Sequence, residues 1–269
     1  MKIKYFLILI TLFLSGKVIS QSNIKTVESF IQKTKIDLEL NQINSILGNK
    51  VESKRSEISS KEDFLKFSKI INENFNSKKG TYYLKEYFLN KENDISLNLI
   101  IDLYNKPLMV KMSNYEIESI NPKNKENQIA FFKGMKENPP KKSRVELLLN
   151  LNETLRATTR TKNLLEEIMI SFYKSYNLIK EEKDLIKLND LKLKISSELP
   201  PNLSQSITNQ FVALGLYTYK DASDSDLKNY IEIWKSDLGK QYIDITFRAY
   251  KYTFDKMTLN LITNLNNTF

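Results

Sequence analysis

The chain has 269 residues, with 41 Lys or Arg against 32 Asp or Glu, and it contains no histidine and no cysteine. These absences exclude disulfides, Ser-His-Asp and Cys-His catalysis, and the usual zinc, haem-histidine and iron–sulfur sites. Only six glycines and six prolines are present. This composition favours long helices over a turn-rich sandwich or barrel, and it leaves too few glycines for a phosphate-binding loop.

The N-terminal segment, residues 1–20, has the pattern of a secretory signal peptide. Lys2 and Lys4 provide a basic start, and residues 5–14 form an apolar run, which matches the usual basic and apolar regions of such a segment. An uncleaved buried helix is the alternative. We therefore expect residues 1–20 to be removed, the mature chain to begin at Gln21, and the protein to be exported, either periplasmic or secreted.

The formal charge of +9 falls to +6 when the three lysines of the leader, Lys2, Lys4 and Lys17, are removed. A basic protein can bind nucleic acid or an anionic envelope surface. Here the lysines alternate with acids, as in residues 61–63 and 180–184, which is typical of solvated helix faces. We expect no nucleic-acid partner, and no later run approaches the roughly 20 apolar residues of a membrane span.

Apolar residues at helical spacing predict an all-α helical bundle. In the first half we expect a helix over 25–47 ended by Gly48, a helix capped by Ser60 with Asp63, and a short aromatic helix over 82–89. A further helix opens at 93–94 and is interrupted by Pro107, because proline cannot continue a helix. Residues 115–120 are the one candidate strand.

Residues 137–143, with two adjacent prolines, mark the clearest boundary. We predict an N-terminal helical unit over 21–137, a linker over 138–142 and a C-terminal helical unit over 143–269. Ser143 and Glu146 have the spacing of a capping box for the next helix. Later helices are expected over 158–179, 185–199 and 202–219, and a last long helix runs from 236 to about 265.

The two units contain segments that align without a gap when Tyr87 is laid over Tyr217. At the same offset Asp94 falls on Asp224, and Tyr104 falls on Trp234. Acidic residues therefore align with acidic residues, and aromatic residues align with aromatic residues. Either two amphipathic helices align by chance, or the chain carries an internal repeat of two related helical units, which we prefer.

The downstream copy predicts a helix–break–helix corner around the single tryptophan. Ser223 can cap the first helix and Ser236 the second, and Gly239 would allow the two helices to approach closely. Trp234 then lies inside the corner. It either lines a ligand site or packs in the core, and aromatic stripes at helical spacing are mostly core.

The corner motif resembles that of a family of bacterial exported all-helical domains of unknown function, in which an aromatic residue is followed by a hydroxyl residue, proline, glycine and lysine or glutamine. Trp234, Ser236, Gly239 and Lys240 match it, with Asp237 in place of the proline. The upstream copy keeps Tyr104 and Pro107 but not the glycine. The resemblance implies a fold and an exported location, but it implies no activity.

The sequence contains no arrangement of residues that indicates a catalytic site. The Ser171–Lys174 spacing resembles that of penicillin-binding enzymes but lacks its companion motif, and the adjacent Glu166 and Glu167 point in different directions around a helix. We expect no cofactor and no metal. The first hypothesis is a non-enzymatic exported protein that binds an envelope component or partner protein. A carrier of an apolar ligand or lipid and a hydrolase that uses carboxylates alone are the alternatives.

Overall fold

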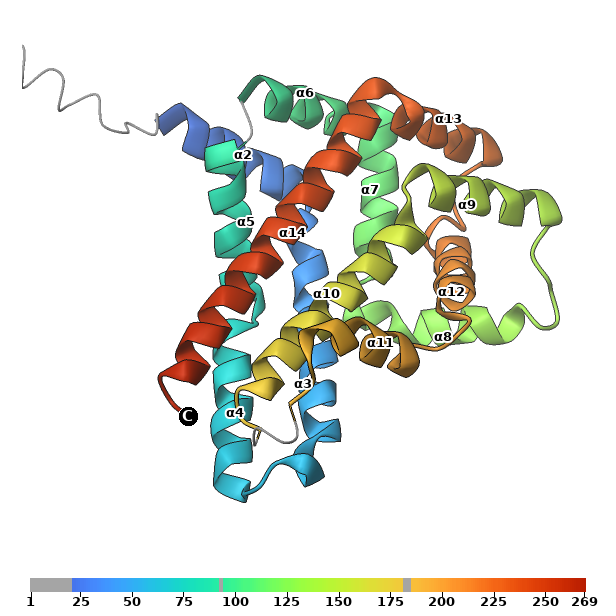
Figure 1. Ribbon diagram of the computed structural model, residues 1–269. Helices are drawn as coiled ribbons and strands as arrows, with labels where there is room; N and C mark the ends of the chain where they lie inside the picture. Colours follow the sequence, from blue (N-terminus) through green and yellow to red (C-terminus); the bar gives the residue numbers. More distant parts are fainter. Residues whose placement is uncertain (1–20, 92–93, 181–184) are drawn as a thin grey trace, which may run out of the picture.

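The computed structural model describes residues 21–91, 94–180 and 185–269 (Figure 1). The signal peptide expected over residues 1–20 lies outside this range. The all-α class is confirmed, since the described residues form a bundle of helices and contain no strand. The α-helices are α2 (Gln21–Thr34), α3 (Ile43–Ser53), α4 (Lys61–Asn74), α5 (Ser77–Lys91), α6 (Asp94–Tyr104), α7 (Pro107–Ser119), α8 (Lys125–Gly134), α9 (Lys142–Thr154), α10 (Ala157–Asn177), α11 (Leu188–Glu198), α12 (Leu203–Thr218), α13 (Asp224–Lys235) and α14 (Asp237–Asn266). Three short 3₁₀ helices join some of them: η1 (Ile36–Gln42), η2 (Arg55–Glu57) and η3 (Pro122–Asn124).

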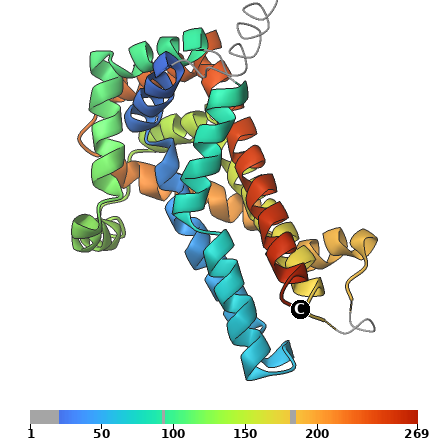
Figure 2. The ribbon, with the colours of Figure 1, turned by 90° about the vertical axis from the view of Figure 1, so that its left-hand side faces the viewer.

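The long helix α14 crosses the bundle diagonally, as the views in Figures 1 and 2 show. It packs against α4 and α5 from the first half of the chain and against α10 and α13 from the second half. Its buried residues recur every three or four positions, which aligns them along one face of the helix. This face includes Thr246, Tyr250, Phe254, Met257, Leu261 and Leu265.

Helices from both sides of residues 138–142 share one hydrophobic core. The helix α12 contacts α7, α13 contacts α7, and α10 contacts α3. One continuous cluster of buried apolar side chains includes Phe30 and Phe67 as well as Phe172 and Trp234. The division into two related units stays a prediction, but the two stretches of chain pack on each other extensively. Within the described ranges, no helix combines the length and the apolar character needed to cross a membrane.

The helix expected over residues 25–47 is wrong as a single element. Helix α2 ends at Thr34, and Lys35 adopts a left-handed backbone conformation with φ of 53°. The chain then continues through η1 and into α3, which passes Gly48 and ends at Ser53. The break turns Ile36 and Leu40 into the core, so tertiary burial overrides the continuous helical pattern of the sequence.

Two other expectations in the first half are also wrong. Helix α5 begins at Ser77 and includes Gly80, so it is longer than the aromatic helix expected over 82–89. The Asn76 side chain accepts a hydrogen bond from the Lys79 backbone and so starts α5 early. Residues 115–119 are helical rather than extended, because α7 continues through them to Ser119.

The sequence predicted the start of most helices correctly, but not of all. Ser60 accepts a hydrogen bond from the Asp63 backbone, and Pro107 occupies the first turn of α7 after α6 ends. The capping box expected at Ser143 is wrong: α9 begins at Lys142, after an extended Lys141, and no side chain caps it. Lys141, with φ of −58° and ψ of 135°, takes the N-cap position itself, so Ser143 lies inside the first turn of α9.

Candidate functional site

The corner between α13 and α14 forms as the sequence predicts. Ser223 and Asp226 make a reciprocal capping box at the start of α13. The chain breaks at Ser236, whose hydroxyl accepts a hydrogen bond from the Gly239 backbone at 3.1 Å and donates one to the Ile233 carbonyl at 2.6 Å. Gly239 is required here, since a Cβ atom would lie 2.5 Å from that carbonyl oxygen. The backbones of α13 and α14 are therefore in direct contact at the corner.

The structure brings Trp234 and Tyr104 together, although they come from opposite halves of the chain. Their ring centroids are 6.2 Å apart in an edge-on arrangement, and Trp234 is only 3% exposed. The same sequence offset that separates these two residues also separates the helix starts Asp94 and Asp224, and the helix starts Pro107 and Asp237. Duplication stays a prediction, but the two corners are in direct contact.

The remaining residues of the motif lie on the outside of the corner. Pro107 and Ser236 are exposed. Lys240 is exposed as well, and its ammonium lies 3.8 Å from Asp237 on the same helix turn. These residues shape the two corners, whereas Trp234 and Tyr104 are the ones that reach the interior.

A cavity of about 490 Å³ lies beneath the two corners. It is bounded by η1, α7 and α10 and by the ends of α12, α13 and α14. One wall is aromatic, and neighbouring rings along it have centroids 5.3 to 6.2 Å apart. The rings are those of Tyr104, Tyr219, Tyr230, Trp234 and Tyr242.

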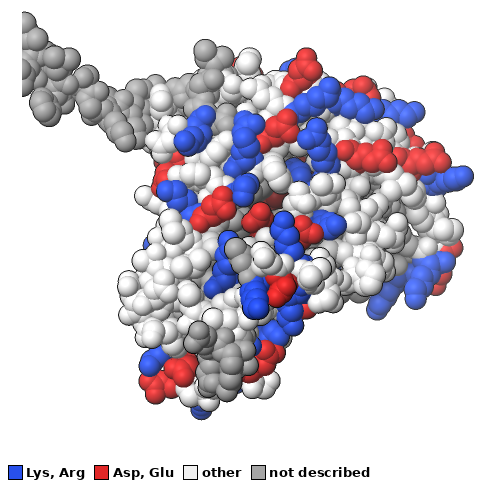
Figure 3. Space-filling view, in the orientation of Figure 1, with Lys and Arg blue, Asp and Glu red and all other residues white. Residues whose placement is uncertain are grey.

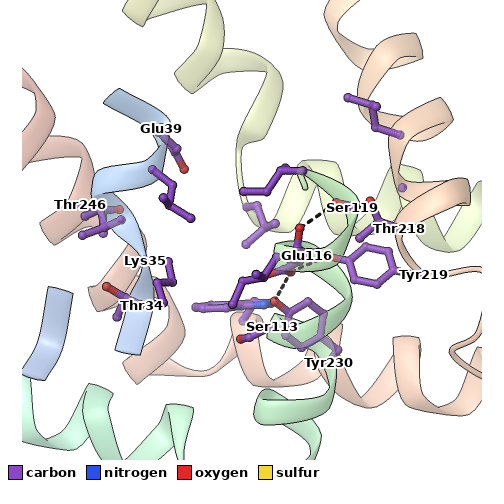
Figure 4. A pocket seen from close by; sticks show the side chains of 18 of the residues that line it. Thr34, Lys35, Glu39, Ser113, Glu116, Ser119, Thr218, Tyr219, Tyr230 and Thr246 are labelled. Atoms are coloured by element: carbon purple, nitrogen blue, oxygen red, sulfur yellow. Dashed lines mark hydrogen bonds between the residues drawn. The ribbon is translucent and has the colours of Figure 1, made fainter. Parts of the chain in front are cut away.

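Glu116 on α7 places a carboxyl group against this wall (Figure 4). The hydroxyls of Tyr219 and Tyr230 both donate to its Oε1 atom, at 2.6 and 2.7 Å. The side chain borders the cavity and so keeps partial exposure, yet burial raises the pKa of the carboxyl. The two phenol hydrogen bonds oppose this shift, and the charge of Glu39 adds to it.

The two phenols act only as donors to Glu116. Burial, followed by the charge of Glu116, raises the pKa of both Tyr219 and Tyr230 well above the ordinary value, so both hydroxyls stay protonated. Glu116 itself makes no ion pair within the described part of the chain, and the second oxygen, Oε2, has no hydrogen-bond partner there. The site thus holds a carboxyl group without an ion pair among the described residues, although Lys33, Lys35 and Arg160 line the same cavity.

Two other polar atoms at the cavity are buried without a hydrogen-bond partner among the described residues. They are the indole Nε1 of Trp234 and the hydroxyl of Ser113. The indole opposes the raised pKa of Tyr230, but its Nε1 and the phenol oxygen are not placed for a normal hydrogen bond. Unpaired buried donors are costly, and a ligand oxygen would satisfy them once either side chain turned toward the cavity.

A second cavity of about 560 Å³ adjoins the first and shares Glu39, Arg160 and Phe211 with it. It lies between α10 and α14, and its apolar lining includes Ile170 and Phe254. Figure 3 shows basic and acidic side chains interleaved over this face, with a hollow near its middle. The two cavities together could hold a molecule with a polar end and an apolar body.

The other chemical candidates of the sequence do not form sites. Ser171 is buried and hydrogen-bonded to Thr258 and the Glu167 carbonyl, whereas Lys174 is exposed. Glu166 and Glu167 line the edge of the second cavity, each near a lysine. The described residues contain no cluster of acids suited to hold a metal ion.

Sequence reasoning missed Glu116 and its hydrogen bonds to the two tyrosines. Glu116 lay within the stretch interpreted as a strand, so its helical neighbours were not considered. Helical spacing places it four residues after Met112 and seven after Met109, both fully buried. An acid on the apolar face of a helix is the signal that would have identified it.

No family model, curated protein or solved structure matches this chain. The resemblance of the corner motif to exported helical domains therefore stays a prediction. What can be said of function depends on the cavity itself.

Proposed function

We propose that this is an exported, non-catalytic binding protein that holds a small amphipathic molecule in the cavity beneath the Trp234 corner. The observation that carries the proposal is the cavity of about 490 Å³ lined by Trp234. Ligand sites commonly have volumes of about 300 to 1,000 Å³, mostly apolar walls and a few convergent polar groups. This cavity has such walls and one such group, Glu116.

The leader sequence supports export, and the ligand would then be an envelope component or a molecule carried through the envelope. The adjoining cavity supports an amphipathic rather than a wholly polar ligand, because Phe211 lies between the two spaces and Phe254 lines the second. The broader hypothesis, a protein partner on the outer surface, has no comparable feature in its favour.

The lone tryptophan reports occupancy of the cavity directly. We expect the fluorescence of Trp234 to shift and saturate with at least one of octanoate, octanol, octyltrimethylammonium or phospholipid vesicles. Ser113→Phe, which places a ring in the cavity, should abolish that change. Asn114→Phe is the matched control, because Asn114 is the next residue on α7 and is exposed. A flat response to every ligand would refute the proposal.

A second candidate is a hydrolase that uses carboxylates alone. Glu116, with its raised pKa, suits a general acid, and Glu39 lines the same cavity. Such enzymes pair an acid with a second carboxylate across the scissile bond. Release of reducing sugar from envelope glycan by the wild type, and its loss in Glu116→Gln, would favour this candidate over binding alone.

A further inference from the structure

We infer that the bound molecule is an organic ammonium cation, whose charge lies against Glu116 and the aromatic wall while its apolar part extends toward Phe211. This rests on the proposed function and names the ligand class of the same cavity. Three features of the described residues support it: the carboxylate without an ion-pair partner, the arrangement of the rings, and the unpaired donors.

The charge of Glu116 needs a partner. Tyr219 and Tyr230 stabilise the carboxylate through hydrogen bonds, but neither supplies a positive charge. Lys33, Lys35 and Arg160 also border the cavity, but none of them forms an ion pair with Glu116 within the described residues. Lys33 and Lys35 are exposed, whereas Arg160 is half-buried and its charge acts on Tyr242. An anionic ligand at the rings would place a second negative charge beside Glu116 in a poorly solvated space, which is costly. A cation there would offset it.

The aromatic wall also favours a positively charged ligand. A cation is attracted to a tyrosine or tryptophan face within about 6 Å of the ring centroid, and groups of such rings recognise methylated ammonium groups. Trp234 and Tyr242 have centroids 5.3 Å apart, and Tyr230 lies 5.7 Å from Trp234. A methylated ammonium touching this wall beside Glu116 would reach more than one ring. Such a group needs no hydrogen bonds of its own.

The unpaired donors indicate a second chemical feature of the ligand, an oxygen that accepts a hydrogen bond. The Nε1 of Trp234 and the hydroxyl of Ser113 lack partners in the described structure, and both residues border the cavity that holds Glu116. An oxygen a few bonds from the ammonium nitrogen would accept from either group once that side chain turned toward the cavity. Choline-like head groups carry both features, whether free or at the end of a lipid.

The test compares ligands that share an eight-carbon chain and differ in charge. Isothermal titration of the mature protein would use octyltrimethylammonium, octanol and octanoate. We expect the cation to bind at least about 30-fold more tightly than octanol, as for a buried charge pair. Glu116→Gln should remove that preference while keeping an acceptor for both tyrosines. Glu118→Gln, an exposed acid two residues away on α7, should leave it intact.

The outcomes separate this inference from the proposed function. Binding of octanol or octanoate equal to or tighter than that of the cation would overturn the inference and leave the cavity a general binding site. Binding of none of them, and of no phospholipid, would refute both. Among positive results, competition by choline alone indicates a free cation, whereas competition only by phosphatidylcholine vesicles indicates a lipid.

The stability of Glu116→Gln gives a readout that a purely structural carboxylate would not produce. Because burial raises the pKa of Glu116, the folded protein disfavours its ionised form, and the charge destabilises the empty protein at neutral pH. The variant should therefore unfold at equal or higher urea concentration than the wild type while it loses the cation preference. A clear loss of stability would show that Glu116 supports the fold instead.

Discussion

Gly239→Ala tests the geometry of the corner with a single methyl group. The added Cβ would lie 2.5 Å from the Ile233 carbonyl oxygen, 2.6 Å from that of Trp234 and 2.7 Å from the Trp234 Cα. All three are backbone atoms at the end of α13, so no side-chain rotation relieves the contact. The two helices must separate by several tenths of an ångström, and the packing of Trp234 must change with them.

The size of the effect follows from two opposing contributions. Overpacking in a well-packed region costs about 1 to 3 kcal/mol and sometimes more, and three backbone contacts place Gly239 at the upper end. Alanine in place of glycine in a helix recovers at most about 1 kcal/mol. The free energy of unfolding should therefore fall by about 2 kcal/mol or more. Gly48→Ala in α3, where a Cβ meets nothing within 4 Å, should raise it slightly.

The assay is urea unfolding followed by far-UV circular dichroism on both variants. Gly215→Ala provides an intermediate case, because its Cβ would lie 2.8 Å from a flexible methyl group of Leu148, which can move. We expect stability to decrease in the order Gly48→Ala, Gly215→Ala, Gly239→Ala. A Gly239→Ala protein as stable as the Gly48→Ala protein would refute the corner geometry.

Three further expectations can be measured on single variants. Hydrogen bonds from Ser223 and a nearby lysine lower the pKa of Asp226 from 3.8 to about 2. Since the folded-state pKa is depressed, this stabilisation is present above about pH 3.8 and is lost as the pH falls toward 2. The stability of Asp226→Asn should therefore change less than that of the wild type over that pH window, and an identical pH profile would contradict this. Tyr219→Phe removes a donor to Glu116 and should cost about 1 to 3 kcal/mol in urea unfolding; no loss would mean that the bond contributes little. Trp234→Ala should cost about 3 to 5 kcal/mol, and normal stability would contradict its burial.

Local signals in the sequence predicted the fold class and most helix starts. Ser60, Ser223 and Ser236 cap the helices that they were expected to cap, because a cap depends on residues within one turn. The break at Lys35 could not be predicted in this way. A left-handed lysine is unfavourable locally, and it persists because the chain beyond it buries Ile36 and Leu40.

The site was predicted in part. Trp234 and Tyr104 were identified from the repeat, and the glycine requirement at 239 followed from the corner. Glu116 on α7 contacts α13 and the residue after α12, and both tyrosines lie more than 100 positions after it in the chain. A single sequence does not reveal which buried acid meets which tyrosine. A helical interpretation of residues 107–119 would have shown only that Glu116 shares a face with two buried methionines.

Trp234 was weighed as either a packing residue or a ligand residue, and the structure allows it to be both. Its ring is buried in the corner, whereas the residue lines the cavity and its Nε1 is buried without a partner among the described residues. Trp234→Phe separates the two roles, because it keeps an aromatic ring and removes only the donor and some area. The lost area destabilises, but removal of an unpaired buried donor offsets it by about 1 to 3 kcal/mol.

We therefore expect Trp234→Phe to unfold within about 1 kcal/mol of the wild type, in contrast to the alanine variant. If the ligand carries an oxygen near its cation, choline should bind Trp234→Phe several-fold more weakly in isothermal titration, whereas tetramethylammonium, which has no oxygen, should bind both proteins alike. Equal losses for the two ligands would assign the effect to the ring face rather than to the N–H group. No loss for either would leave Trp234 as a packing residue of the corner alone.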